Sequence, residues 1–255
     1  MFSTTASTAL EEIRQRTGRL QAALKDRNVD AALIFQKTDL YYFAGTIQQG
    51  QLYVPADAEP VLMVRKNAER ARAESPIPNQ VPVDRPKQIT EVLARQHIAP
   101  PRRLGLEMDV IPAKLYLALG EIFPDARLLD ISDTVRTIRS VKSEAEIALI
   151  REAARCADQV AEFAAGALKE GIAEIELAGL VEAEARRLGH QGFVRMRLWD
   201  HELFYGHLMA GARAAVPSYL ASPTGGAALS PAVAQGSSLH PIRPREPVLV
   251  DYVFA

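Results

Sequence analysis

The stretch Arg139-Ser140-Val141-Lys142-Ser143-Glu144-Ala145-Glu146-Ile147 separates two parts of this 255-residue sequence that differ in pattern. Ser143 and Glu146 form a capping box, because the serine hydroxyl and the glutamate carboxylate can each satisfy a backbone N–H at a helix start. Apolar residues then recur at helical spacing, which predicts a long helix over residues 143–169. We therefore place a domain boundary just before this helix.

Upstream of the boundary, short apolar runs alternate with helical patterns. Ala31–Phe35 is a continuous apolar run, which suits a strand buried on both faces. Two further runs, Gln51–Val54 and Val61–Val64, flank a segment with prolines and an aspartate, so they predict a hairpin. The remaining predicted elements are helices at 9–27, 67–74 and 87–96 and a strand at 104–107. This alternation is typical of an α/β layer architecture, which we assign to residues 1–138.

Downstream of the boundary, the helical pattern gives way to a segment rich in turn residues. A second amphipathic helix is predicted at 173–188 and ends at Gly189, a suitable C-cap residue. From Gly192 onward helix signals are few and glycine, proline and serine are frequent, until an apolar strand at 247–255. We assign these elements to a second domain at 143–255.

The charge and cysteine content exclude several classes of partner. The chain has 30 basic and 31 acidic residues, so it has no overall field that would gather nucleic acid or an anionic membrane. It has no apolar run of the roughly 20 residues that span a bilayer, and no secretory signal. The single cysteine, Cys156, cannot form an internal disulfide and is interpreted as an inert helix residue. We therefore expect a cytoplasmic protein without nucleic-acid or membrane partners.

The carboxylate of Asp251 lies inside the apolar final strand. If it were buried without a partner, it would cost several kcal/mol, so a metal, a base or water would have to accompany it. The alternative is an aspartate on the solvent-facing side of a half-exposed strand, with Val250 and Tyr252 on the opposite face. The residue pattern leaves both interpretations open.

The histidines provide weaker candidates for a site. His207 and His240 are the two that we consider for chemistry, but neither belongs to an HExxH pair, and no Cys/His spacing predicts structural zinc. For each of them a satisfied or surface imidazole is the alternative. The glycine segment Ser222–Ala227 is followed by no Lys-Ser/Thr and does not predict a nucleotide site.

Three motifs resemble those of one known family. The stretch at 139–147 is similar to the Arg-x-x-Lys-x-x-x-Glu-Ile linker of Xaa-Pro peptidases, prolidases and creatinases, the M24-type metallopeptidases. Gly171–Leu177 is similar to their Gly-x-x-Glu-x-Glu-Leu helix start, and Glu246–Asp251 to their Gly-Asp-x-Val-Leu-Val-Asp strand. The resemblance covers nearly the whole chain. It implies a creatinase-like N-terminal α/β domain followed by the first half of a pita-bread α+β domain.

The resemblance also implies an activity. Members of this family hold two divalent metal ions, manganese, cobalt or zinc, through two Asp, one His and two Glu, and cleave the bond before proline in peptides with proline in the second position. Asp251 occupies the position of the first metal ligand. The other ligands would follow Ala255, so we expect this chain to be truncated within its catalytic domain and inactive by itself.

Other residues are carried over less directly. The resemblance places Ser230 where many members have a histidine that binds the transition state, and only a shifted loop would let His240 replace it. Tyr205 and His207 are candidates for lining the substrate pocket. Family members often pair through their N-terminal domains, which makes a homodimer possible. The alternatives are a non-catalytic binding or assembly module with this fold, and a creatinase-type C–N hydrolase.

Overall fold

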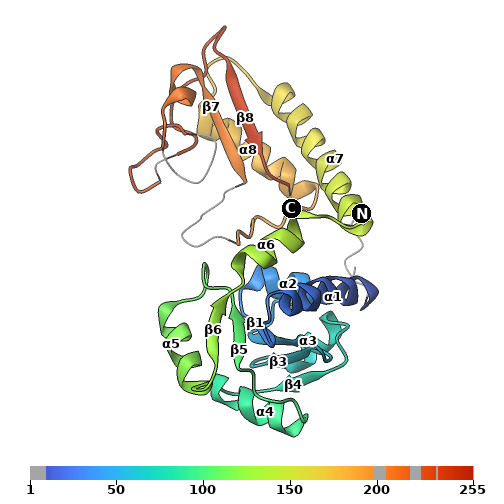
Figure 1. The fold of residues 1–255 in the computed structure, drawn as a ribbon. Coiled ribbons are helices and arrows are strands. Elements are labelled where there is room, and N and C mark those ends of the chain that lie inside the picture. The colour runs from blue at the N-terminus through green and yellow to red at the C-terminus, as the bar shows by residue number, and fades with distance from the viewer. Residues whose placement is uncertain (1–9, 198–204, 219–224, 234, 255) are drawn as a thin grey trace. The chain divides into compact units, whose positions relative to one another are not determined.

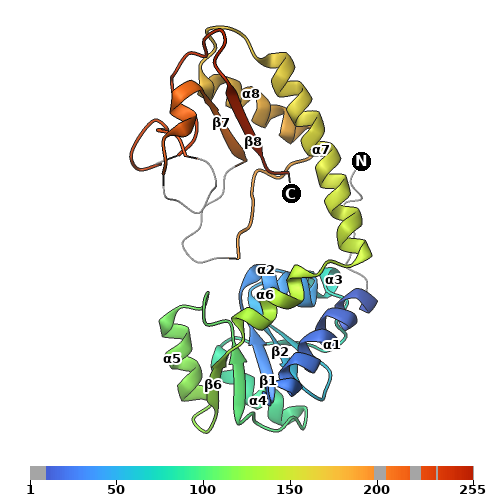
Figure 2. The same cartoon turned by 45° about the horizontal axis from the view of Figure 1, so that its top comes forward.

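The chain forms two compact units in a computed structural model that describes residues 10–197, 205–218, 225–233 and 235–254. The units meet in the sequence between Val141 and Lys142, and Arg197 groups with the first unit. Each unit has its own sheet and its own helices (Figures 1 and 2). The second unit therefore begins next to the capping box of Ser143 and Glu146.

The first unit is built on a six-stranded mixed sheet in the order β4-β3-β2-β1-β5-β6. Its strands are β1 (Ala31–Ile34), β2 (Gly50–Pro55), β3 (Val61–Val64), β4 (Gln80–Pro82), β5 (Arg103–Leu106) and β6 (Arg127–Asp130). β2 is antiparallel to β1 and β3, which confirms the predicted hairpin, and the other neighbours are parallel. All residues of β1 are buried, as its continuous apolar run predicts.

Helices cover both faces of this sheet. They are α1 (Leu10–Asp26), α2 (Lys37–Ala44), α3 (Ala68–Glu74), α4 (Ile89–Arg95), α5 (Ala113–Ile122) and α6 (Ser132–Ser140), with a 3₁₀ turn at Pro86–Gln88. Ala32 and Ile34 of β1 share a core with α1, α2, α3 and α6, whereas Ala31 and Leu33 share one with α4 and α5. The alternation of side chains along a strand thus divides the helices into two layers.

The second unit packs two helices against one face of an antiparallel strand pair. Its elements are α7 (Glu144–Ala167), α8 (Glu174–Arg187), β7 (Gly206–Ala210), a 3₁₀ turn at Gly211–Ala215 and β8 (Val248–Tyr252). The predicted capping box is confirmed, since the Ser143 N–H donates to Glu146 Oε2 at 2.9 Å and the Glu146 N–H donates to Ser143 Oγ at 3.2 Å. None of the helices in the described ranges is long and apolar enough to cross a membrane.

Several elements differ from those predicted. Helices α2, α5 and α6 and strand β7 are not among the predicted elements, and β8 ends at Tyr252 rather than at residue 255. α2 starts at an unusual N-cap, Gln36, whose side-chain oxygen accepts from the Asp39 N–H at 3.0 Å. Because Ser, Thr, Asp and Asn are the usual N-caps, the sequence lacks the common start signal there.

Candidate functional site

The pairing of β7 with β8 brings Asp251 opposite His207. The Val253 N–H donates to the Tyr205 oxygen at 2.8 Å, and this hydrogen-bonded pair fixes the register of the strands. Leu208 and Tyr252 belong to the core shared with α7 and α8. Since side chains alternate along a strand, His207 and Asp251 share the other face, the one that those helices do not cover.

Asp251 and His207 differ in exposure. The Asp251 side chain is partly exposed, whereas His207 is 3% exposed. His207 Nε2 lies 3.1 Å from Gln235 Nε2, so the neutral imidazole can accept a hydrogen from the amide. Burial lowers the pKa of His207, and the negative charge of Asp251 opposes that shift. His207 is therefore a neutral imidazole beside a carboxylate.

These two side chains do not make a dinuclear metal centre. Within the described ranges, no group of three or more His, Cys, Asp or Glu side chains could hold a metal ion. A metal pair bridged by several carboxylates needs more ligands than one aspartate and one histidine. The candidate ligand Asp251 is thus positioned on the open face of the hairpin, with His207 as its cross-strand neighbour.

A cavity of about 380 Å³ lies between α8, β7 and a loop that contributes residues 228–230, 233 and 235–237, and we call it the α8–β7 pocket. Its walls include His207 and Ser230, two of the candidates from the sequence. Ser230 Oγ accepts from the Ala232 N–H at 3.2 Å. Asp251, Tyr205 and His240 are not among the lining residues, so the structure brings together only part of the candidate set.

Tyr205 lies in an aromatic cluster. Its ring centroid is 4.4 Å from that of His190, and Arg186 lies over the ring at 5.3 Å. Its hydroxyl is buried, and no described group hydrogen-bonds to it. The His190 imidazole accepts from the Gly192 N–H at 2.8 Å, and burial lowers its pKa.

His240 contacts Glu246 in the loop before β8. Its Nε2 lies 3.1 Å from Glu246 Oε2, and the same oxygen accepts from the Arg243 N–H at 3.0 Å. The Arg243 N–H and His240 hold the pKa of Glu246 below its usual range. The described geometry therefore engages the His240 imidazole in this pair rather than beside Ser230.

Glu174 is a buried residue whose role the sequence motif did not indicate. It is 1% exposed at the start of α8, and its carboxylate accepts three hydrogen bonds. Oε1 accepts from the Ala210 N–H at 2.7 Å, and Oε2 accepts from the N–H and hydroxyl of Ser238 at 2.8 and 2.6 Å. One carboxylate thus ties the end of β7 to the loop that borders the α8–β7 pocket.

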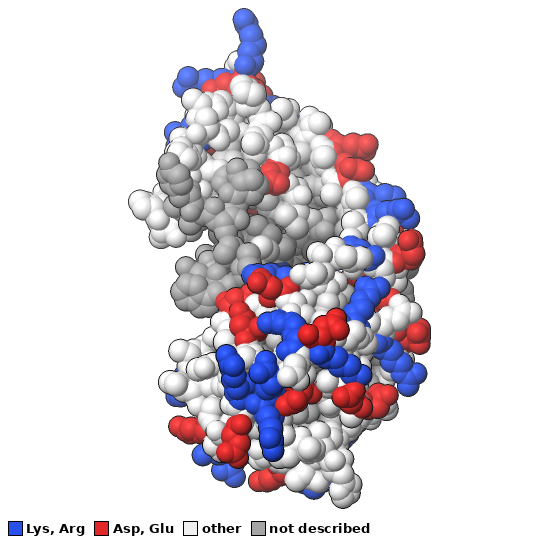
Figure 3. Space-filling model, viewed as in Figure 1, with Lys and Arg blue, Asp and Glu red and all other residues white. Residues whose placement is uncertain are grey.

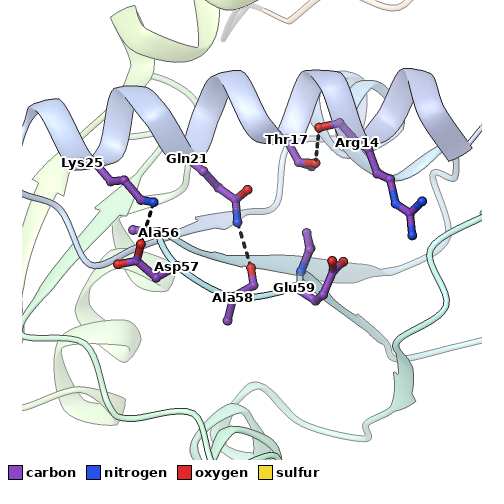
Figure 4. Close-up of a pocket in the computed structure, with 9 residues that line it drawn as sticks. Arg14, Thr17, Gln21, Lys25, Ala56, Asp57, Ala58 and Glu59 are labelled. Atoms are coloured by element: carbon purple, nitrogen blue, oxygen red, sulfur yellow. Dashed lines mark hydrogen bonds and ion pairs between the residues drawn. The ribbon is translucent and has the colours of Figure 1, made fainter.

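A second cavity, of about 560 Å³, lies on the first unit between α1 and the β2–β3 turn. Figure 4 shows that polar side chains lining this cavity are paired with other lining residues. Lys25 contacts Asp57 at 2.6 Å, and Gln21 Nε2 donates to the Ala58 oxygen at 2.8 Å. Figure 3 shows both signs of charge interspersed over this unit, in keeping with the balanced composition. Nothing in this groove indicates catalysis.

A cluster of charged side chains lies at the ends of β1 and β5 in the first unit. Asp39 is fully buried and pairs with Arg139 and with Arg197, whose Nε lies 2.7 Å from Asp39 Oδ2. Glu107 Oε2 accepts from the Phe35 N–H at 2.8 Å. Burial, and then the adjacent Asp39, raise the pKa of Glu107 well above its usual range.

Comparison with known proteins identifies both units. Residues 16–141 match the Creatinase/Prolidase N-terminal domain, and residues 148–255 match Metallopeptidase family M24. The chain therefore carries a creatinase/prolidase-type N-terminal domain followed by a part that matches metallopeptidase family M24. The resemblance inferred from the linker, the helix start and the final strand is thereby confirmed, together with the creatinase-like domain and the partial pita-bread domain.

The chain is similar to curated and solved proteins along most of its length. An uncharacterized peptidase, SERP1271 of Staphylococcus epidermidis, is 26% identical over 184 residues, covering 67% of this chain and 49% of that protein. The Xaa-Pro dipeptidase from Bacillus anthracis has a TM-score of 0.76 at 20% identity, covering 95% of this chain and 61% of that one.

The prolidase from Pyrococcus horikoshii OT3 has a TM-score of 0.72 at 21% identity, covering 93% of this chain and 60% of that one. At these identities the solved structures show the fold. The chain spans about half the length of the curated relatives it matches.

Proposed function

We propose that this chain contributes the N-terminal domain and part of the M24 domain of an Xaa-Pro peptidase, which hydrolyses the bond before proline in peptides with proline in the second position. The observation that carries the proposal is the position of Asp251, on the helix-free face of the β7–β8 pair and opposite the buried His207. The fold shared with a solved Xaa-Pro dipeptidase and a solved prolidase supports it.

In this proposal Asp251 offers one carboxylate to a pair of manganese, cobalt or zinc ions. His207 and Tyr205 contribute to substrate binding, and Ser230 lies on the same cavity wall as His207. His240 acts in catalysis only if it leaves Glu246, to which it is now paired. The proposed enzyme is cytoplasmic and forms a homodimer through its N-terminal domain.

The test is an assay of the complete gene product with Xaa-Pro dipeptides in the presence of manganese, cobalt or zinc. We expect release of the first residue, and loss of that activity in Asp251→Asn. Asp57→Asn, which removes a carboxylate from the surface of the first unit, is the control and should retain full activity. Absence of cleavage with all three metals would refute the proposal.

A non-catalytic binding or assembly module is the second candidate. The observation that favours it is that the described residues provide no group of three metal-binding side chains. Calorimetry on the complete gene product separates the two, since the module should bind no divalent ion tightly and the peptidase should bind two. A creatinase-type C–N hydrolase would bind metal but leave Xaa-Pro peptides intact.

A further inference from the structure

The α8–β7 pocket has aliphatic walls. Ile175 and Ala178 of α8 and Leu229 and Val233 of the loop are among its lining residues. Its volume of about 380 Å³ falls near the lower end of the roughly 300–1,000 Å³ found for small-molecule sites. Such walls favour a ligand with a small apolar group.

The polar groups that border the pocket include hydrogen-bond acceptors, besides the hydroxyls of Ser230 and Ser237. Gln235 is 4% exposed, and its Oε1 is buried with no hydrogen-bond partner among the described residues, while its Nε2 contacts His207. A buried amide oxygen without a partner costs roughly 1–3 kcal/mol, which a donor from a ligand would offset. Gln235 therefore marks a place where the pocket lacks a donor.

The strand edge supplies a second acceptor. Tyr205 and Val253 form a hydrogen-bonded pair, so the next pair, Gly206 with Tyr252, directs its backbone groups outward. Gly206 lines the pocket, and this pairing pattern turns its carbonyl oxygen away from β8. The outer edge of β7 is thus open for hydrogen bonding at this point.

A carboxylate completes the set. Glu182 follows Ile175, Ala178 and Gly179 on the pocket-facing side of α8. No described side chain hydrogen-bonds to it. Burial raises the pKa of Glu182 and the charge of Arg186 one turn later opposes that shift, while Arg186 donates its hydrogen bond to the Gln191 oxygen at 2.8 Å. No Lys or Arg is among the described lining residues. The pocket therefore combines a negative charge and two acceptors with an apolar wall.

We infer that the α8–β7 pocket binds a small ligand that carries a primary ammonium group beside an aliphatic side chain. An ammonium group has three donors and one positive charge, which match the carboxylate of Glu182, the Gln235 amide oxygen and the Gly206 carbonyl. The N-terminal residue of a peptide and a free amino acid share this chemistry. The inference goes beyond the proposed hydrolysis, because it requires neither a metal nor Asp251.

The test is calorimetry on this chain with a chelator present and four probes: L-leucinamide, N-acetyl-L-leucinamide, L-leucine and L-leucyl-glycine. We expect L-leucinamide and L-leucyl-glycine to bind at least about 10-fold more tightly than the acetylated probe, which lacks the ammonium group. Binding of L-leucine as tight as that of L-leucyl-glycine identifies a free amino acid as the ligand, and weaker binding identifies a peptide.

Two variants locate the binding. Glu182→Gln should weaken L-leucinamide about 10-fold by removing the charge, and Val233→Trp, at a rim position that is 46% exposed, should block entry without disturbing the core. Asp57→Asn on the first unit is the matched control and should bind as the parent does.

Equal binding of the free and acetylated probes, an unchanged affinity in both variants, or no binding at about 10 mM probe would each overturn the inference. None of these results depends on cleavage of Xaa-Pro peptides. Failure of the proposed hydrolysis would therefore leave the binding result intact.

Discussion

Glu174 links two backbone segments through a single buried carboxylate. It accepts from the amide of Ala210 at the end of β7 and from the amide and hydroxyl of Ser238. A hydrogen bond to a charged group contributes roughly 1.5–3 kcal/mol to stability, and leaving a buried donor without an acceptor costs a similar amount. Glu174 is therefore a major contributor to the order of the loop beside the pocket.

Glu174→Ala should lower the free energy of unfolding of the second unit by about 3 kcal/mol, because two buried N–H groups lose their acceptor. Urea unfolding measures the change, and hydrogen exchange should become faster at the amides of Ala210 and Ser238. Glu176→Ala on the exposed side of the same helix turn is the control. Equal effects of the two substitutions would show that the three hydrogen bonds contribute little.

Glu107 is a carboxyl group that the fold keeps protonated over a wider pH range than the unfolded chain does. It is fully buried next to Asp39, and its raised pKa means that the folded state binds more protons above pH 4.5. The stability that it contributes is fully present below that ordinary pKa and is lost as the pH rises towards the folded value. A rise in pH above the ordinary carboxyl pKa should therefore destabilise the first unit.

Glu107→Gln should remove this pH dependence. The glutamine oxygen can still accept from the amides of Phe35 and Gln36, and its NH₂ group can donate to Asp39 as the protonated acid would. The variant should lose less stability than the parent between about pH 5 and pH 9 in urea unfolding. Parallel pH profiles would mean that Glu107 is not protonated in the folded protein.

The sequence identified some site residues and could not identify others. Asp251 was detectable because a carboxylate interrupts an apolar strand, but its pairing with His207 depends on β7, which the sequence pattern did not predict. Gln235 and Glu182 carry no local signal. They become candidates only because α8 and the loop meet beside β7, which is a tertiary arrangement. The catalytic roles of Ser230 and His240 stay predictions.

At the level of elements, strong local signals gave the correct structure. The capping box of α7, the buried β1 and the β2–β3 hairpin each have a cause within a few residues of sequence. The helix α2 does not, since its N-cap is Gln36 and its Tyr-Tyr-Phe sequence reads equally well as a strand. Packing of Leu40 and Phe43 into the core decides in favour of the helix.

The capping box of α7 provides a test at this scale. Ser143→Ala should lower the free energy of unfolding of the second unit by about 1 kcal/mol, because the Glu146 N–H loses its side-chain acceptor. Gln159→Ala, an exposed site within α7, should change it by less than about 0.5 kcal/mol. Denaturant unfolding compares the two. Similar losses at both positions would assign the effect to helix propensity rather than to the cap.

The described residues form three hydrophobic cores, two in the first unit and one in the second, and no residue belongs to more than one of them. Leu33 belongs to the core between the six-stranded sheet and α4 and α5, whereas Leu177 belongs to the core of the second unit. Large-to-small substitutions in a core cost about 2–5 kcal/mol, and that cost should remain within the unit that contains the substitution. A single free energy of unfolding would then not describe the chain.

Leu33→Ala should therefore accelerate hydrogen exchange in β1 and its neighbours while leaving β7 and α8 unchanged, and Leu177→Ala should do the reverse. Mass spectrometry of exchanged peptides follows both units in one experiment. Each variant serves as the control for the other. If either substitution accelerated exchange equally in both units, the chain would unfold as one cooperative body.

Cys156 lies within α7 and is 7% exposed, and the chain has no other cysteine. A thiol-specific dye can react with it only when the helix moves away from its packing. Under conditions where that motion is fast, the labelling rate is proportional to the fraction of molecules that are open. The labelling rate of Cys156 therefore reports transient opening of the second unit, and no reporter group has to be added.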